Sequence, residues 1–227
     1  MSEIAENLQA VTARIAGAAR AAGRDPATVR LLAVSKTKPA TDIRAAYRAG
    51  QRAFGESYLQ EALGKLAELS GLDIEWHFIG RLQSNKTRQV AEHFAWVHGL
   101  ADLHHAERLA AQRPPDLAPL AVCLQVNLSG EASKGGVAAH DLPALAAAVA
   151  VLPGLRLRGL MTMPDPHSPP DVQRAVFGRL RELLTELNRT GLGLDTLSMG
   201  MSGDLEAAIA EGATIVRVGT AIFGSRA

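Results

Sequence analysis

Apolar residues occur along the chain in short runs that alternate with longer amphipathic stretches. The first stretch carries Ile4, Leu8, Val11 and Ile15 at helical spacing and predicts an amphipathic helix. The later runs, rich in Val, Ile and Leu, predict strands, and the stretches between them predict helices. The predicted strands cover 30–36, 52–55, 74–80, 95–100, 119–128, 155–163, 196–200 and 214–219; the predicted helices cover 41–50, 57–69, 85–94, 103–113, 141–152, 169–189 and 203–212.

Regular alternation of strands and helices is typical of a parallel sheet. Eight strand–helix units in 227 residues favour closure into a (β/α)₈ TIM barrel, here with an extra helix in front. An open doubly wound sheet is the alternative, but no G-x-G-x-x-G follows the first predicted strand. No low-complexity linker interrupts the pattern, and the Pro-rich stretch 164–171 is predicted to be a loop. We therefore expect residues 1–227 to form one domain.

Composition narrows the range of partners and locations. The chain has 24 basic and 23 acidic residues, a formal net charge of +1, which favours neither nucleic acid nor an anionic membrane as a partner. No apolar stretch reaches the roughly 18 residues that a membrane span needs, and the amino terminus does not resemble a signal peptide. The lone Cys123 lies in an apolar run and is predicted to be a core residue in a reducing, cytoplasmic compartment.

The carboxyl ends of the strands hold the functional residues of a TIM barrel. Lys36 ends the first predicted strand, so its amine is expected at the barrel mouth. Apolar walls there would favour the neutral amine and Schiff-base formation. The spacing alone favours the other interpretation, a strand-end lysine whose amine reaches solvent.

The loops after the seventh and eighth strands commonly bind phosphate in these barrels. Here they read GMSGD and VGTAIFG, in which glycines allow backbone N–H groups to approach an anion and Ser202 and Thr220 add hydroxyls. Ser202 also fits the N-cap of helix 203–212. Arg217 lies in a strand that should be buried, so it needs a partner, either a carboxylate such as Glu56 or a ligand atom.

No metal site or nucleophile–His–acid triad is indicated, because none of the seven histidines stands at ligand spacing from acids. The motifs AVSKT, FGESY, WHFIG, GLMTM, SMGMS and VRVGTAIFG follow one another across almost the whole chain. In this order they resemble the pyridoxal phosphate homeostasis protein family, whose fold is the N-terminal barrel of alanine racemase.

The resemblance implies pyridoxal 5′-phosphate (PLP) as cofactor and assigns a role to each motif. Lys36 would carry PLP as a Schiff base, and Arg217 would face the pyridine nitrogen. Phosphate contacts would come from Ser202, Gly219 and Thr220, the pocket would be lined by His77 and Met163, and Lys134 would take part in handling PLP. Ser57 replaces the asparagine that the family usually has in FGENY, so this position offers a shorter polar side chain.

An arginine at the pyridine nitrogen disfavours ring protonation and so weakens the electron sink that carbanion chemistry needs. Alanine racemase adds a second domain with a catalytic tyrosine, whereas this sequence ends at Ala227 and has tyrosines only at 47 and 58. The resemblance therefore implies a monomeric protein that holds PLP and supplies it to apo-enzymes. The alternatives are a weak PLP-dependent amino-acid racemase and a barrel enzyme that uses Lys36 on a sugar phosphate.

Overall fold

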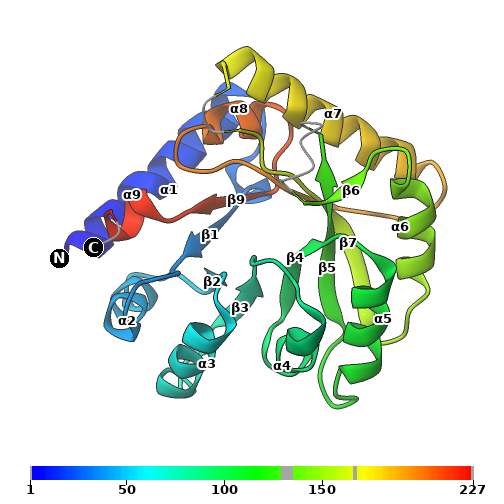
Figure 1. The fold of residues 1–227 in the computed structure, drawn as a ribbon. Helices are drawn as coiled ribbons and strands as arrows, with labels where there is room; N and C mark the ends of the chain where they lie inside the picture. Colours follow the sequence, from blue (N-terminus) through cyan, green and yellow to red (C-terminus); the bar gives the residue numbers. More distant parts are fainter. Residues whose placement is uncertain (1, 129–134, 166–167, 226–227) are drawn as a thin grey trace.

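Parallel strands close into a barrel in the computed structural model, which describes residues 2–128, 135–165 and 168–225. Strands β1 to β5, then β7, β8 and β9, pair in parallel in chain order, and β9 pairs with β1 to complete the ring (Figure 1). This closed ring of eight strands confirms the predicted (β/α)₈ barrel and excludes the open sheet. The strands are β1 Arg30–Val34, β2 Ala53–Glu56, β3 Glu75–Phe78, β4 Trp96–Leu100, β5 Leu120–Asn127, β7 Leu155–Met161, β8 Thr196–Ser198 and β9 Ile215–Val218.

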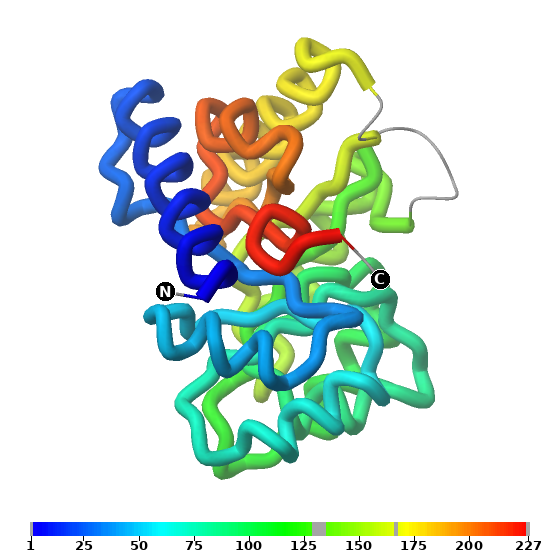
Figure 2. The backbone as a smooth tube through the Cα atoms, turned by 90° about the vertical axis from the view of Figure 1, so that its left-hand side faces the viewer, coloured from blue at the N-terminus to red at the C-terminus, as the bar shows by residue number. Residues whose placement is uncertain are grey.

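Helices surround the barrel on its outside (Figure 1). They are α1 Glu3–Ala21, α2 Ala40–Arg48, α3 Leu59–Glu68, α4 Thr87–His93, α5 Leu103–Gln112, α6 Leu142–Ala150, α7 Pro170–Asn188, α8 Leu205–Ala210 and α9 Thr220–Phe223. The predicted extra helix α1 is present, and it packs against α2, α8 and α9; Figure 2 shows α1 (blue) beside α9 (red). None of the described helices is long and apolar enough to cross a membrane.

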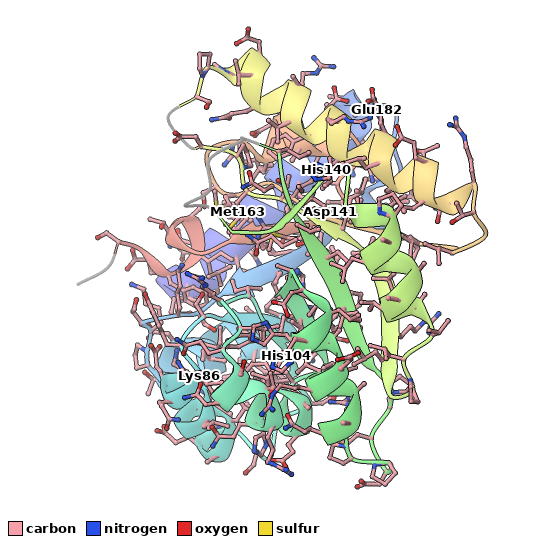
Figure 3. All side chains as sticks on the ribbon, turned by 45° about the vertical axis from the view of Figure 1, so that its right-hand side comes forward. Lys86, His104, His140, Asp141, Met163 and Glu182 are labelled. Atoms are coloured by element: carbon pink, nitrogen blue, oxygen red, sulfur yellow. The ribbon has the colours of Figure 1, made fainter. Side chains whose placement is uncertain are left out.

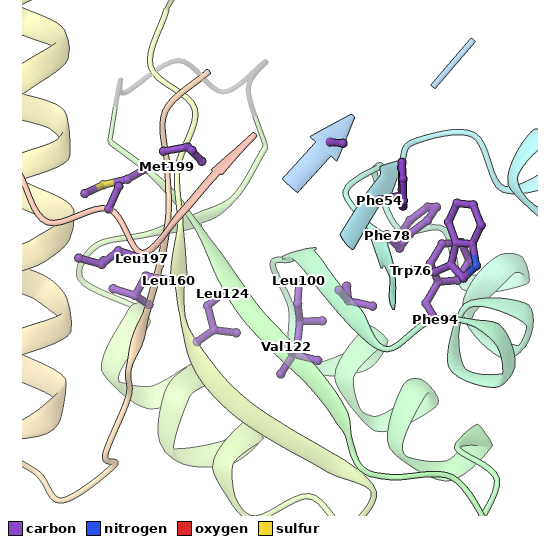
Figure 4. Close-up of a cluster of buried hydrophobic side chains, with 14 of the residues drawn as sticks. Phe54, Trp76, Phe78, Phe94, Leu100, Val122, Leu124, Leu160, Leu197 and Met199 are labelled. Atoms are coloured by element: carbon purple, nitrogen blue, oxygen red, sulfur yellow. The ribbon is translucent and has the colours of Figure 1, made fainter. Parts of the chain in front are cut away.

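The main core lies between the barrel and the helices, because each helix buries only its apolar face. Leu8, Val11 and Ile15 of α1 are buried as their spacing predicts. Most of the aromatic side chains gather on one side of this core, around β2, β3 and α4 (Figure 4). There the ring of Phe78 meets that of Phe94 edge to face, with centroids 5.4 Å apart.

A smaller cluster of side chains fills the inside of the barrel, comprising Leu32, Ala53, Trp96, Ala121, Cys123, Met161 and Ile215. Since an eight-stranded barrel has room only for packed side chains, most of these are small or of middle size. Burial raises the pKa of the Cys123 thiol to about 12, so Cys123 is a core residue, as predicted. Gly159 allows the closest strand approach, because a Cβ there would lie 1.8 Å from the Thr196 carbonyl oxygen.

Four short elements lie outside the predicted set: η1 Pro26–Thr28, η2 Ser84–Lys86, the two-residue strand β6 Val137–Ala138 beside β5, and α9. Helix α8 is shorter than predicted and begins at Leu205, with Asp204 as its N-cap residue. The interpretation of Ser202 as the N-cap is therefore wrong. The Asp204 carboxylate accepts a hydrogen bond from the Met201 N–H, at 2.5 Å, and this turn delays the start of the helix.

Candidate functional site

Lys36 stands in a turn two residues after the end of β1. Leu32 faces into the barrel, so strand alternation gives Val34, the last residue of β1, the same inward direction, and Lys36 follows in the turn. The side chain of Lys36 is half-buried. The next residue, Thr37, has a φ of 65°, which is strained for a β-branched residue and is common at functional turns. The Thr37 N–H donates to Oε1 of Glu61 at 2.6 Å, and this bond holds the turn.

A buried ion cluster lies behind that turn, on the outer side of β1 and β2. Nζ of Lys65, on α3, donates to the Ser35 carbonyl oxygen and to Oε1 of Glu56, both at 2.8 Å, and also to Glu61. Oγ of Ser35 donates to the same Glu56 oxygen at 2.6 Å. Burial raises the pKa of the Glu56 carboxyl. We call Lys65, Glu56, Glu61 and Ser35 the outer cluster; it fixes both residues that flank Lys36.

Arg217 is buried on the inner side of β9, and of the two partners predicted for it the carboxylate of Glu56 was wrong. Nη1 donates to the Ser198 carbonyl oxygen at 2.7 Å and to Oγ of Ser198 at 2.8 Å, and Nη2 donates to the Thr162 carbonyl oxygen at 3.0 Å. Glu56 cannot be the partner of Arg217, because strand alternation points its side chain outward to α3. Desolvation lowers the pKa of Arg217 to about 10, so it stays charged at neutral pH.

Two buried histidines extend the contacts of Arg217 through the barrel. Nδ1 of His98, on β4, lies 2.7 Å from Oγ of Ser198, and its Nε2 lies 2.9 Å from Nδ1 of His77. Nε2 of His77 lies 2.6 Å from Oε1 of Glu75 at the start of β3. His77 is thus fully buried below the mouth, and it is absent from the residues that line the mouth cavity described below.

The two predicted phosphate loops lie beside β1, since β1 pairs with β9 and β9 with β8. Gly219 approaches β1 closely, because a Cβ on it would lie 3.0 Å from the Val34 carbonyl oxygen. Thr220 is exposed and Ser202 is half-buried. The Ser202 carbonyl oxygen accepts a 2.8 Å hydrogen bond from Nη1 of Arg14, so α1 braces this loop from outside.

Met163 and Ser57 follow the two strands that flank the run of β1, β9 and β8, one on each side. Met163 follows β7, is 41% exposed and borders a cavity of about 270 Å³, together with Arg81, Gln125 and others (Figure 3). Ser57 follows β2 and is half-buried. Lys134 lies outside the described residues.

The barrel therefore brings most of the predicted residues to one rim. Consecutive strands β2, β1, β9 and β8 carry Ser57, then Lys36, then Arg217 with Gly219 and Thr220, then Ser202. Sequence reasoning missed the outer cluster and the role of His98. A signal for His98 exists, because His98 and Trp96 alternate on one strand and therefore share its inner face.

The chain matches the alanine racemase N-terminal domain family over residues 6–227. This chain belongs to that family. Within the family it is 67% identical over its whole length to the pyridoxal phosphate homeostasis protein of Pseudomonas aeruginosa, 97% of which is covered. It is 52% identical, again over its whole length, to the protein of the same name from Escherichia coli K12, 98% of which is covered. The resemblance drawn from the motifs is therefore confirmed.

Two solved structures are similar to this chain. PipY of Synechococcus elongatus, in the structure with PLP bound, is 41% identical, with a TM-score of 0.86 over 97% of this chain and 100% of PipY. Alanine racemase from Corynebacterium glutamicum is 21% identical, with a TM-score of 0.73, and this chain covers 60% of it. The second likeness shows the shared barrel fold.

Proposed function

We propose that this protein binds PLP at the barrel mouth as a Schiff base on Lys36, and that it keeps and supplies the cofactor rather than catalysing a reaction. The observation that carries the proposal is the pairing of β1, which leads into the turn of Lys36, with β9, which carries Arg217, next to the predicted phosphate loops. PipY, which shares the fold at 41% identity, has a structure with PLP bound. We further propose that residues 1–227 act as one monomeric binding unit.

The polar groups of the rim fit the parts of PLP. Nη1 and Nη2 of Arg217 are engaged, whereas Nε makes no hydrogen bond to any described residue and can donate to a ring nitrogen. The loops at Ser202–Gly203 and Gly219–Thr220 offer backbone N–H groups and hydroxyls to the phosphate. Met163 and the half-buried Ser57 can border the ring, and His77 supports the site from below.

The charge of Arg217 favours storage over catalysis. In carbanion chemistry, the pyridine ring of PLP serves as an electron sink when its nitrogen is protonated. A guanidinium donor opposite the ring nitrogen opposes that proton, because two positive charges would meet there. Arg217 retains its charge at neutral pH. The names of the relatives from P. aeruginosa and E. coli agree with such a role.

The covalent part of the proposal is tested by borohydride reduction and peptide mapping. The protein mixed with PLP should show Schiff-base absorbance, and reduction should leave a pyridoxyl group on Lys36. Lys36→Ala should lose the label, whereas the control Lys38→Ala should keep it, because Nζ of Lys38 is bound to the Ser225 carbonyl oxygen. A label on another residue, or none, would overturn the assignment.

The supply of PLP is tested by reactivating an apo-enzyme while a phosphatase destroys free PLP. We expect reactivation to persist if the cofactor passes directly from this protein; its complete loss would refute direct supply. Chiral analysis of alanine and serine tests the racemase alternative. Turnover above about 1 per second would contradict the non-catalytic role. Tyr58, exposed beside Ser57, is the residue to replace by Phe if racemisation is seen.

A further inference from the structure

A continuous line of hydrogen bonds crosses the inside of the barrel from Arg217 to Glu75. Its successive contacts are Arg217 Nη1 to Ser198 Oγ at 2.8 Å, Ser198 Oγ to His98 Nδ1 at 2.7 Å, His98 Nε2 to His77 Nδ1 at 2.9 Å, and His77 Nε2 to Glu75 Oε1 at 2.6 Å. The side chains of Ser198, His98 and His77 are fully buried. We call these five residues the inner chain.

Arg217 and Glu75, the two ends of the inner chain, fix the direction in which hydrogen bonds are donated along it. Arg217 has only N–H donors, so Ser198 Oγ must accept from it. Glu75 pairs with Arg30 at 2.7 Å, and its pKa is lowered to about 2, so its carboxylate can only accept. Nε2 of His77 must therefore donate to Glu75.

The neutral state of the two histidine rings then decides which atoms donate and accept in the middle of the inner chain. Burial lowers the pKa of His77 and of His98, so both rings are neutral and each carries one N–H. His77 uses its N–H on Glu75 and accepts at Nδ1 from His98. His98 in turn accepts at Nδ1 from the Ser198 hydroxyl. Every contact then joins one donor to one acceptor.

The surroundings protect this arrangement. The ring of Trp96 stacks on that of His77, with centroids 5.4 Å apart and planes 5° from parallel. The apolar side chains of the barrel interior surround the inner chain. At low local dielectric, hydrogen bonds in a chain polarise one another, so each link strengthens the next.

We propose that Ser198 and His98 are positioning residues that fix the guanidinium of Arg217 through this directed chain, so that Nε stays aimed at the bound ligand. The proposal deepens the proposed function and rests on it, because the aromatic ring of PLP is the group that Nε would meet. A hydroxyl that already gives its proton to His98 can only accept from Arg217.

Nitrogen NMR of the ligand-free protein, with ¹⁵N-labelled histidine, tests the direction by itself. At pH 7, His77 and His98 should both be protonated at Nε2 and unprotonated at Nδ1, with the exposed His104 as the reference for a ring in water. A proton on Nδ1 of either buried ring would overturn the directed chain. This readout holds even if the protein fails to bind PLP, a failure that would refute the proposed function alone.

PLP binding to folded variants tests the positioning role. Ser198→Ala and His98→Phe should each weaken binding about tenfold or more, and His98→Gln should recover part of the loss because its amide oxygen supplies an acceptor for the Ser198 hydroxyl. The control Cys123→Ala, inside the same barrel but outside the chain, should bind as the wild type does.

The decisive comparison repeats His98→Phe in an Arg217→Met background. A residue that acts through Arg217 should have no further effect there, as a double-mutant cycle requires. An equal loss of binding in both backgrounds would overturn the proposal, as would wild-type affinity of both Ser198→Ala and His98→Phe.

Discussion

Lys65→Met gives the sharpest test of the outer cluster. The side chain of Lys65 is only 7% exposed, and its amine donates to three acceptors. Methionine has a similar length but no donor, so the variant leaves the fully buried Glu56 carboxylate with the hydroxyl of Ser35 as its described donor. Oε2 of Glu56 already has no partner among the described residues.

The magnitude follows from the cost of an uncompensated buried charge. Removing one partner of a buried ion pair costs about 3–5 kcal/mol of unfolding free energy. Glu56 can reduce this cost by taking up a proton, because burial already raises its pKa. A carboxyl with a raised pKa in the folded state favours folding at low pH and loses that advantage as pH rises above its unfolded value of about 4.5. The loss should therefore be larger at pH 8 than at pH 5.

Urea unfolding at both pH values, followed by circular dichroism, measures the effect. Adding Glu56→Gln to Lys65→Met should recover most of the lost stability, because the amide carries no charge. Lys38→Met, on the same turn, is the control and should cost about 1 kcal/mol or less. Wild-type stability of Lys65→Met at pH 8, or no recovery in the double variant, would refute the reasoning.

Three further outcomes are expected. Burial lowers the pKa of both His77 and His98 in the folded protein, and both rings take up a proton below about pH 6.5 when unfolded; urea unfolding should therefore show less stability at pH 5.5 than at pH 8, and His98→Gln should reduce this difference. Ser202→Ala and Thr220→Ala should each weaken PLP binding, measured by equilibrium dialysis, by about 1.5–3 kcal/mol; unchanged affinity in both would place the phosphate elsewhere. Gly80→Ala should lower the melting temperature, because its Cβ would lie 2.2 Å from a backbone oxygen, whereas Gly64→Ala, in open space on α3, should not.

The barrel could be predicted because its strands and helices differ in apolar period. The eight barrel strands and the helices from α1 to α8 lie where the period changes, with ends that differ by a few residues. The start of α8 shows why helix boundaries are hard to predict. The Asp204 carboxylate accepts a hydrogen bond from the Met201 N–H, and the helix therefore begins past Ser202. Such a bond depends on local geometry that apolar spacing does not encode.

The candidate site was only partly predictable for a related reason. Strand ends identify which residues reach the mouth, so Lys36, Ser202 and Thr220 could be predicted from the sequence to lie there. The hydrogen-bond partners of buried polar residues, in contrast, lie on other elements of the fold. The contact of Arg217 with Ser198 joins two strands, and the contact of Lys65 with Ser35 spans 30 positions. A lysine within a helix normally indicates a solvated face, and nothing in the local pattern marks Lys65 as buried.

The outer cluster and the inner chain lie on opposite faces of the barrel wall, the first beside β1 and β2 and the second on β3, β4, β8 and β9. Buried charge pairs are weak evidence for stability, because desolvation offsets most of the attraction between them. Ser35, which follows β1, is held by the outer cluster through its hydroxyl and its carbonyl oxygen, so the residue before Lys36 is fixed from the outer side. On the neighbouring β9, Arg217 points inward and is held by the inner chain. The backbone on both sides of Lys36 and the guanidinium of Arg217 are thus each held by neighbouring side chains, which is the kind of support that a preformed binding site needs.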